Sequence, residues 1–459
     1  MESRRGLPFT QSIMKGKGNM AFSLKGVHVP HRKNTRDAKA VAMPSPATVT
    51  IPMSMHIGAP AKPCVKVGDP VSVGTLIAEA GGFVSAPIHA SVSGKVTKIA
   101  DFLLSSGQTV PAVVIESDGL MTPDPALQPP AVDSRESLLE AIKQSGVVGL
   151  GGAGFPTHVK FNVDPARIEY LIINGAECEP YITSDTRTML DRVDDMMTAL
   201  RAMAAHFGIK NVVIGIEANK KEAITSMRMM AAALRNHCSV TVKVLPSVYP
   251  QGGEKVLIYH TVGRTVPMGK LPIDVGCVVV NCTTLAAIGE YLATGMPLVQ
   301  KCVTVDGGAV KEPKNILVPI GTPLSAVFDF CGGLTRDPDK VLYGGPMMGI
   351  TVPDLSAPIL KNTNAVLALT PKETKLPKTT NCIRCGACLN TCPFGLAPAN
   401  IARAYDKKDA VALDELKVNA CMECGCCSFV CPANRPLVQT NKLAKQFLKE
   451  EKAKEEAKA

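Results

Sequence analysis

The chain has 459 residues, of which 46% are hydrophobic and 20% charged. This composition indicates a globular chain long enough for about two to four domains. No apolar run approaches the roughly 18 residues that a membrane span needs, so we expect no transmembrane segment. The formal net charge is +10, yet nothing resembles a nucleic-acid recognition module, so nucleic acid is not an expected partner.

Sixteen cysteines are present, and nine of them lie between Cys382 and Cys431. We find no signal peptide ahead of them. A dense cysteine cluster in such a chain indicates metal-bound thiolates in a reducing compartment rather than disulfides.

The first feature along the chain is a basic N-terminal segment, residues 1–45. Its first forty residues hold nine Lys or Arg side chains, among them Lys25, Arg32 and Lys33, against two acidic ones. We expect a solvated, partly disordered tail, which is usual for such a charge run. Contact with an anionic partner or a membrane surface is the alternative.

Residues 46–122 are predicted to form a small β domain. Between Pro63 and Ile99, short Val-rich stretches are separated by Gly and Pro, as in a small sandwich or barrel. This part resembles the barrel-sandwich hybrid of biotinyl and lipoyl carrier domains. Those carriers present a lysine at a hairpin tip, whereas the turn at 80–83 has none, so we expect a structural or docking role.

Residues 131–298 are predicted to form an α/β domain, separated from the first by a Pro-rich stretch at 123–130. Helical patterns alternate with buried-strand patterns, which is the signature of a sheet covered by helices. The predicted helices are 138–144, 194–207 and 220–236, and the predicted strands are 170–174, 212–216 and 278–281.

The remaining segments are a small module rich in Val, Gly and Pro at 299–355, a cysteine-rich domain at 375–445 and a charged tail at 446–459. The cysteine-rich domain contains a helix-like stretch at 399–417, so we expect it to be mainly helical. The tail is most simply a solvated helix or disorder.

The strongest chemical signal is a cysteine pattern that occurs twice. Three cysteines at intervals of three residues are followed by a fourth that precedes proline. In this pattern three thiolates hold one [4Fe-4S] cluster while the fourth reaches the other cluster. We therefore assign one cluster to Cys382, Cys385, Cys388 and Cys431, and the second to Cys421, Cys424, Cys427 and Cys392. Two structural zinc sites are the weaker alternative. Cys426 is surplus and is expected to be a buried thiol, with a role as a cluster ligand as the alternative.

A second signal is the glycine-rich run Gly149–Pro156, which matches the dinucleotide-binding spacing literally. A Rossmann fingerprint follows a strand, however, whereas 138–144 has a helical pattern. Closely spaced glycines still allow backbone N–H groups to approach a phosphate or a flat ring. On this run alone, an ordinary tight turn is an equal alternative.

Three further motifs accompany this run, at 174–180, 252–254 and 281–285. Together the four resemble, in order, the NADH-binding flavoprotein subunit of respiratory complex I. The resemblance implies that the glycine run and positions 174 and 281 hold FMN, and that acidic residues help form the flavin and NADH site. The expected binding residues are Gly151, Gly152, Ala153, Gly154, Phe155, Lys160, Asn174, Glu177, Glu179, Gly252, Gly253, Glu254, Asn281 and Thr284.

The chain departs from that family at Leu150, where complex I has arginine, and at Lys255, where a second acidic residue is missing. Surface charge or helix capping is the alternative role for Glu177 and Glu179. As chemistry, their carboxylates suit nucleotide hydroxyls, and Lys160 suits the phosphates or the flavin.

The whole order of segments resembles the C subunit of the Rnf electron-transport complex, and residues 25–33 resemble that family's opening. This implies a multidomain α/β protein: a barrel-sandwich-like β domain, an α/β FMN- and NADH-binding domain, a small β-grasp-like module and a mainly helical ferredoxin-like domain with two [4Fe-4S] clusters. It also implies an NADH-dependent oxidoreductase subunit, in which hydride transfer between NAD(H) and FMN precedes one-electron transfer through the clusters.

The expected partners are NAD(H), the integral-membrane and iron–sulfur subunits of the same complex and, indirectly, ferredoxin. The expected location is the cytoplasmic face of the membrane, as a peripheral subunit of a complex that moves sodium or protons. Two alternatives remain: a soluble flavin and iron–sulfur cobalamin reductase, which usually lacks the leading barrel, and a non-enzymatic scaffold that only carries clusters.

Overall fold

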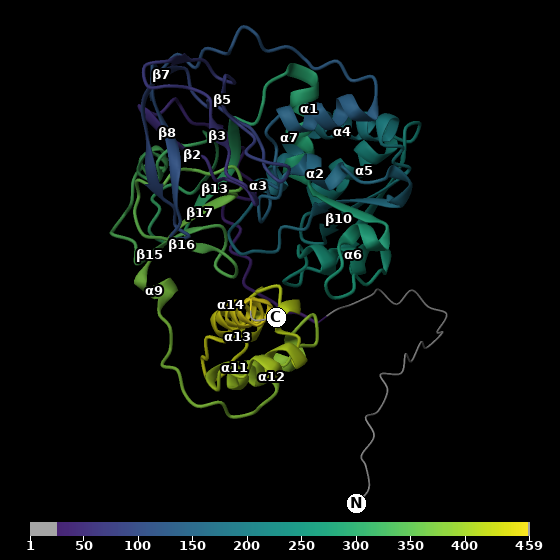
Figure 1. Ribbon diagram of the computed structural model, residues 1–459, viewed down its shortest axis with the longest axis vertical. Helices are drawn as coiled ribbons and strands as arrows, with labels where there is room; N and C mark the ends of the chain where they lie inside the picture. The colour runs from purple at the N-terminus through teal and green to yellow at the C-terminus, as the bar shows by residue number, and fades with distance from the viewer. Residues whose placement is uncertain (1–24, 458–459) are drawn as a thin grey trace, which may run out of the picture.

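A computed structural model of the chain describes residues 25–457, which form four parts in chain order (Figure 1). This multidomain α/β architecture confirms the predicted fold class. No helix within the described range is long and apolar enough to span a membrane.

The first part is a β domain made of two small sheets (Figure 1). Alternation of buried and exposed residues along its strands places Ile51, Val113 and Ile115 in a shared core. One sheet has the order β2 (Thr48–Pro52), β8 (Thr109–Ser117), β7 (Gly94–Leu103) and β4 (Pro70–Val71). The other has the order β3 (Lys62–Pro63), β5 (Leu76–Glu79) and β6 (Ile88–His89).

The second part is an α/β domain with a four-stranded parallel sheet. The sheet order is β11 (Ser239–Leu245), β10 (Asn211–Glu217), β9 (Tyr170–Gly175) and β12 (Cys277–Asn281). The helices are α1 (Arg135–Gln144), α2 (Thr157–Phe161), α3 (Ser184–Asp191), α4 (Val193–His206), α5 (Lys221–Ala233), α6 (Glu254–Val262) and α7 (Cys282–Thr294). The predicted helices and strands of this part are confirmed to within a few residues at their ends.

The third part contains a six-stranded mixed sheet. Its order is β1 (Val41–Ala42), β14 (Lys314–Pro319), β13 (Gln300–Asp306), β17 (Ala365–Leu369), β15 (Lys340–Tyr343) and β16 (Ile350–Val352). Helix α8 (Leu324–Phe330) packs on it, with Val327 and Phe328 in the core. The sheet extends past the predicted boundary at residue 355, because β17 pairs with both β13 and β15.

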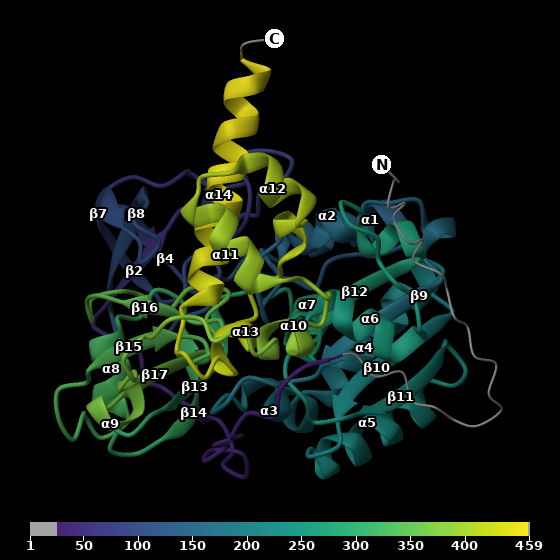
Figure 2. The same cartoon turned by 90° about the horizontal axis from the view of Figure 1, so that it is seen from below.

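The last part is helical and follows the short helix α9 (Pro371–Thr374) and an extended linker. It contains α10 (Ala387–Thr391), α11 (Pro398–Asp406), α12 (Ala410–Glu415), α13 (Cys426–Phe429) and α14 (Leu437–Glu456). The stretch predicted as one helix at 399–417 is two helices, because Lys408 has a positive φ of 54° and breaks the chain direction. The predicted charged tail continues α14 as a helix that projects from the body (Figure 2).

Residues 25–42 form a segment, here called the strap, that contains a turn at 34–38 and crosses three of the four parts. Val27 exchanges two backbone hydrogen bonds with Tyr249, and β1 pairs with β14 of the third part. The hydroxyl of Thr391, in the helical part, donates to the Gly26 carbonyl. The expectation of a solvated tail is therefore wrong for the strap, because its backbone and Lys33 are bound by other parts. Residues 1–24 lie outside the described range.

Candidate cofactor sites

The first candidate site lies at the carboxyl edge of the parallel sheet. Numbered by sequence, the strand order is 3-2-1-4, so the chain changes direction between β9 and β12. Asn174 and Asn281 are register partners at the ends of these two strands. Ligands of open α/β sheets bind in the crevice beside such a switch point. The fold thus places two of the predicted binding residues where this architecture binds ligands.

The glycine run lies against this edge. The run follows helix α1, as the helical pattern at 138–144 indicated. Its Leu150 N–H donates to the Thr284 hydroxyl at 2.9 Å, which ties the run to α7. A side chain at Gly151 would place its Cβ 2.4 Å from Nδ2 of Asn281, so only glycine allows this approach. The N–H groups of the exposed residues Gly151, Gly152 and Ala153 find no acceptor among residues 25–457.

Three hydrogen bonds hold the Asn281 side chain. Its Oδ1 accepts from the N–H groups of Thr283 and Thr284 and caps α7, and its Nδ2 donates to Asp185 at 2.8 Å. The other carboxylate oxygen of Asp185 accepts from the Thr283 hydroxyl at 2.7 Å. Sequence reasoning missed Asp185. Its available signal was an acidic residue in the first turn of a helix, close after the predicted Glu177 and Glu179.

A second group of predicted residues meets on the same edge. Asn174 donates from Nδ2 to the Gly252 carbonyl at 2.9 Å, which ties the loop before α6 to β9. Lys160 Nζ lies 3.0 Å from Glu254 and also donates to the Val279 carbonyl. The two charged side chains are 30% and 41% exposed, so solvent and ligands can reach them.

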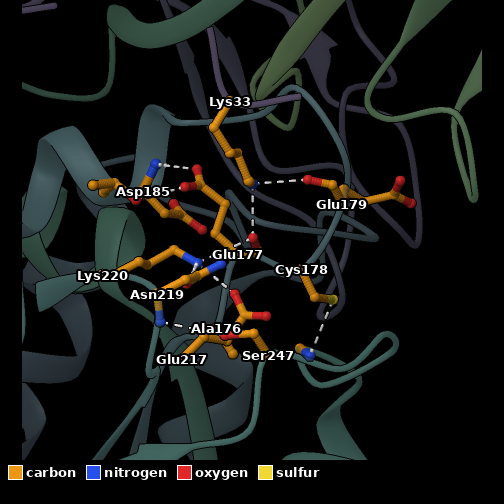
Figure 3. A network of polar contacts seen from close by, with 12 residues as sticks. Lys33, Ala176, Glu177, Cys178, Glu179, Asp185, Glu217, Asn219, Lys220 and Ser247 are labelled. Carbon is orange, nitrogen blue, oxygen red and sulfur yellow. Dashed lines mark hydrogen bonds and ion pairs between the residues drawn. The ribbon is translucent and has the colours of Figure 1, made fainter. Parts of the chain in front are cut away.

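Glu177 is buried and takes the helix-capping role (Figure 3). One carboxylate oxygen accepts from the Asp185 N–H at 2.8 Å and the other from the Thr186 hydroxyl at 2.7 Å, at the start of α3. Burial raises the pKa of Glu177 to about 7, and the nearby Lys33 ammonium opposes this shift. The buried Glu177 carboxylate therefore holds the start of α3 in place at this site.

Glu179 turns toward the third part of the chain. Its carboxylate accepts from the N–H groups of Met347 and Met348 at 3.1 and 2.8 Å. Burial raises the pKa of Glu179 to about 7, while these two hydrogen bonds act to lower it. Glu179 thus joins two domains beside the candidate site.

Lys301 is a second residue that the sequence did not indicate. It lies at the start of β13 and donates from Nζ to the Leu150 carbonyl in the glycine run at 2.5 Å. Burial lowers the pKa of Lys301 to about 7. The two residues are 151 positions apart in the sequence, so no local pattern relates them.

The cysteines of the helical part line two separate cavities. Cys382, Cys385, Cys388 and Cys431 line one, here called the outer cavity. Cys392, Cys421, Cys424 and Cys427 line the other, here called the inner cavity, together with Cys426. This grouping is the one predicted from the spacing, including the exchange of the fourth cysteine. Among residues 25–457, no three His, Cys, Asp or Glu side chains are placed to hold a single metal ion.

The inner cavity adjoins the first candidate site. The Tyr249 hydroxyl donates to the Cys424 carbonyl at 2.7 Å, and Tyr249 itself is 2% exposed. A Cβ on Gly253 would lie 2.4 Å from Cε of Met422, which lines the inner cavity. The loop that carries Gly252 and Gly253 is therefore packed directly against this cysteine set. Cys426 is buried there, as expected.

Four family models match successive parts of the chain. They are the RnfC barrel sandwich hybrid domain at 22–120, the Nuo51 FMN-binding domain at 142–290, the SLBB domain at 302–351 and the 4Fe-4S dicluster domain at 378–435. The fold and the sites thus define a protein with an FMN-binding domain and a 4Fe-4S domain.

Curated relatives are similar over most of the chain. The C subunit of the Na(+)-translocating ferredoxin:NAD(+) oxidoreductase complex of Acetobacterium woodii is 43% identical over 82% of this chain and 86% of that protein. Its proton-translocating counterpart in Clostridium ljungdahlii is 42% identical over 82% and 83%. The C subunit of the ion-translocating oxidoreductase complex of Rhodobacter capsulatus is 40% identical over 95% and 85%. The chain belongs to this family, the C subunits of Rnf complexes.

Among solved structures, an NAD+-reducing [NiFe]-hydrogenase in its H2-reduced state matches with a TM-score of 0.48 and 17% identity, over 69% of this chain and 61% of that chain.

Proposed function

We propose that this chain binds FMN and NAD(H) at the carboxyl edge of its α/β sheet and two [4Fe-4S] clusters in its two cysteine cavities. As a member of the RnfC family, it is part of a ferredoxin:NAD+ oxidoreductase that translocates sodium ions or protons. The observation that carries the proposal is the meeting of the glycine run, Asn174 and Asn281 at the switch point between β9 and β12.

The residues at this edge fit a phosphorylated flavin. Gly151, Gly152 and Ala153 are exposed, and their N–H groups lack acceptors within the described chain, so they can serve as donors to phosphate oxygens. No atom lies within 4 Å of a Cβ built on Gly152, so the space in front of the run is open. Lys160 offers a cation at the same edge and Glu254 a carboxylate.

The two cavities fit iron–sulfur clusters. Each gathers four thiols from both repeats of the pattern, and thiolates are the ligands that cubane clusters take. Cys392 and Cys431 cross over between the repeats, which holds the two clusters in one compact domain.

FMN, when bound, supplies the exchange between two-electron chemistry with a nicotinamide and one-electron chemistry with clusters. Residues of this chain position the loops around the flavin and connect them to the inner cavity. Asn281 and Asn174 orient the loops around the flavin, and the loop of Gly252 and Gly253 contacts Met422 at the inner cavity. The outer cavity, where Cys382 and Cys385 are exposed, faces the other proteins of the complex on the cytoplasmic side of the membrane.

The test is anaerobic reconstitution with iron, sulfide and FMN. We expect absorbance from flavin and clusters that bleaches with NADH. Gly152→Asp places a side chain and a negative charge in the open space before the run, and should abolish flavin binding while dithionite still reduces the clusters. Ser106→Asp, in an exposed turn of the β domain and at a residue without positive φ, is the control for the added negative charge and should behave as the wild type.

A wild-type protein that takes up iron and sulfide but no FMN would refute the flavin site. It would leave a scaffold that only carries clusters.

A further inference from the structure

The strap inserts one lysine side chain beside the candidate flavin site. Lys33 Nζ donates to the carbonyls of Glu177 and Glu179, both at 2.8 Å (Figure 3). It also donates to the Ile182 carbonyl at 2.5 Å. These three bonds use all three donors of an ammonium group. Burial of the group lowers the pKa of Lys33, while Glu177 opposes the shift.

The three carbonyls belong to the turn between β9 and α3, which carries Glu177 and Glu179. Without a cation, carbonyls that converge on one point repel each other and lose their hydrogen bonds on burial. Lys33 therefore determines the shape of this turn. Both sides of the lysine are anchored: Val27 is bonded to Tyr249, and the Thr35 carbonyl accepts from Asn315 Nδ2 at 2.9 Å.

A continuous set of contacts runs from this turn to the glycine run. The Glu177 carboxylate accepts from the Asp185 N–H at 2.8 Å, and the Asp185 carboxylate accepts from Asn281 Nδ2, also at 2.8 Å. Asn281 in turn lies against Gly151 so closely that a Cβ there would be 2.4 Å away. A displaced turn would move α3, and with it the residue that orients Asn281.

The charges around the turn require this cation. The acidic groups near the turn are Glu177, Asp185 and Glu217. Lys33 and Lys220 oppose the charge of Glu177, and Lys301 opposes that of Asp185. Lys220 is already bound to Glu217, Asn219 and the Glu177 carbonyl. Removal of Lys33 would take away the stronger of the two lysine interactions that oppose the charge of Glu177.

We propose that Lys33 is a positioning residue for flavin and NAD(H) binding, which it controls from the N-terminal strap by fixing the turn that carries Glu177 and Glu179. This inference rests on the proposed function, because it assigns a role toward the same site. It gives the strap a function beyond holding the domains together.

The test compares Lys33→Met with Lys39→Met in the full chain. Lys39 is an exposed lysine of the same strap, so its variant controls for the loss of one positive charge. We expect Lys33→Met to weaken FMN binding, measured by flavin fluorescence, by about tenfold to a hundredfold, the effect of losing hydrogen bonds to a charged group. Iron, sulfide and dithionite reduction should stay as in the wild type. Lys39→Met should bind FMN normally.

A second measurement separates positioning from packing. In Lys33→Ala, added propylammonium should restore part of the FMN affinity, because it supplies an ammonium group where the side chain was removed. Tetramethylammonium has no N–H donor and should restore none. Equal recovery with both cations, or with neither, would overturn the role of the donor.

The outcomes are distinguishable. If the wild type binds no FMN, the proposed function fails. If the wild type binds FMN and Lys33→Met binds it equally, with the same KM for NADH, only this inference fails. Should Lys33→Met not fold, Lys33→Gln is measured instead, since its amide has no charge, offers two N–H donors to three carbonyls and adds an acceptor oxygen beside them. Weaker FMN binding supports the proposal and unchanged binding overturns it.

Discussion

The outer and inner cavities draw their cysteines from two copies of one sequence pattern, but their surroundings differ. In the outer set Cys382 and Cys385 are exposed, and three arginines, Arg384, Arg403 and Arg435, line the cavity without any described acidic residue. In the inner set Cys424 and Cys427 are each 7% exposed. The inner set is also covered by Tyr249 and the Gly252–Gly253 loop of another domain.

The difference shows what the cysteine spacing does and does not determine. Spacing brings three thiols of each repeat together, because it is a property of one short loop, and the fourth thiol comes from the other repeat. Burial and hydrogen bonding to the sulfurs come from long-range packing. Within the described chain, hydrogen bonds to a sulfur of the two sets occur only in the inner set. The Glu423 N–H and Asn441 Nδ2 lie 3.4 and 3.5 Å from Cys421 Sγ. Since solvent exposure and such hydrogen bonds set cluster potentials, the two sites should be distinguishable in a redox titration.

The largest expected effect is the loss of one cluster at a time. Cys388→Ser should empty the outer cavity and Cys427→Ser the inner one, so each variant should hold about four irons and four sulfides instead of about eight. FMN binding should persist in both. Cys64→Ser, at an exposed cysteine of the β domain, should keep the full content. Loss of all iron in either variant would show that the two sites do not assemble separately.

Exposure should also set the order in which iron is lost. With a chelator under mild oxidation, we expect a fast phase from the outer set and a slow phase from the inner set, because Cys382 and Cys385 are open to solvent. The fast phase should be missing from Cys388→Ser and the slow one from Cys427→Ser. A single phase in the wild type, or the reverse assignment, would contradict the contrast in burial.

A smaller effect is expected from the contact that covers the inner set. Tyr249→Phe removes the donor to the Cys424 carbonyl and leaves this group unpaired, at a cost of about 1–3 kcal/mol. The spectroscopic signal of the inner cluster should change while that of the outer cluster stays. Tyr343→Phe is matched, since its hydroxyl donates to the Pro358 carbonyl in the third part. Tyr343→Phe should lower the stability of the fold without changing either cluster signal. A changed cluster signal in this control would show that the effect of Tyr249→Phe is not specific to its contact with the inner set.

Much of both sites was predictable from the sequence, because the features are local. The cysteine grouping follows from spacing, and Asn281 and Thr284 were placed by their motif. What the sequence could not supply is which groups meet across long distances. Lys33 binds the Glu177 carbonyl 144 residues away, through a backbone atom that every residue possesses. A basic run with such contacts therefore has the same pattern as a solvated tail.

The chemical role of a predicted residue is also hard to read from its type. Glu177 was expected as a nucleotide ligand, with capping as the alternative, and its carboxylate caps α3. Which of these roles Glu177 takes depends on where α3 begins relative to β9. Tertiary packing determines that position. The helix-like stretch predicted at 399–417 is likewise divided into two helices, because Lys408 adopts a positive φ of 54°.

The smallest effect on the two cysteine sets is expected at a junction that contains no cysteine of either set. This junction serves as the reference for the comparison. Lys361 is buried and donates to the carbonyls of Pro87 in the β domain and Gly146 in the α/β domain, at 2.6 and 2.7 Å. Burial lowers its pKa from 10.5 to about 7. His89, which adjoins the same junction, stays neutral above pH 4 because burial lowers its pKa to about 3.

The sign of the pH dependence follows from this depressed pKa. Between about pH 7 and 10.5 the unfolded chain holds a proton on Lys361 that the folded chain lacks, so the stability of the fold rises with pH. Lys361→Met should flatten this rise by at most about 1.4 kcal/mol per pH unit, measured as the denaturation midpoint between pH 7 and 9. Lys301, whose pKa is also about 7, leaves a residual slope. The fast and slow phases of iron release should remain distinct in this variant, because the junction contains no cysteine of either set. An unchanged slope would show that Lys361 stays protonated in the folded chain, and merged phases would mean that the two cavities depend on this junction after all.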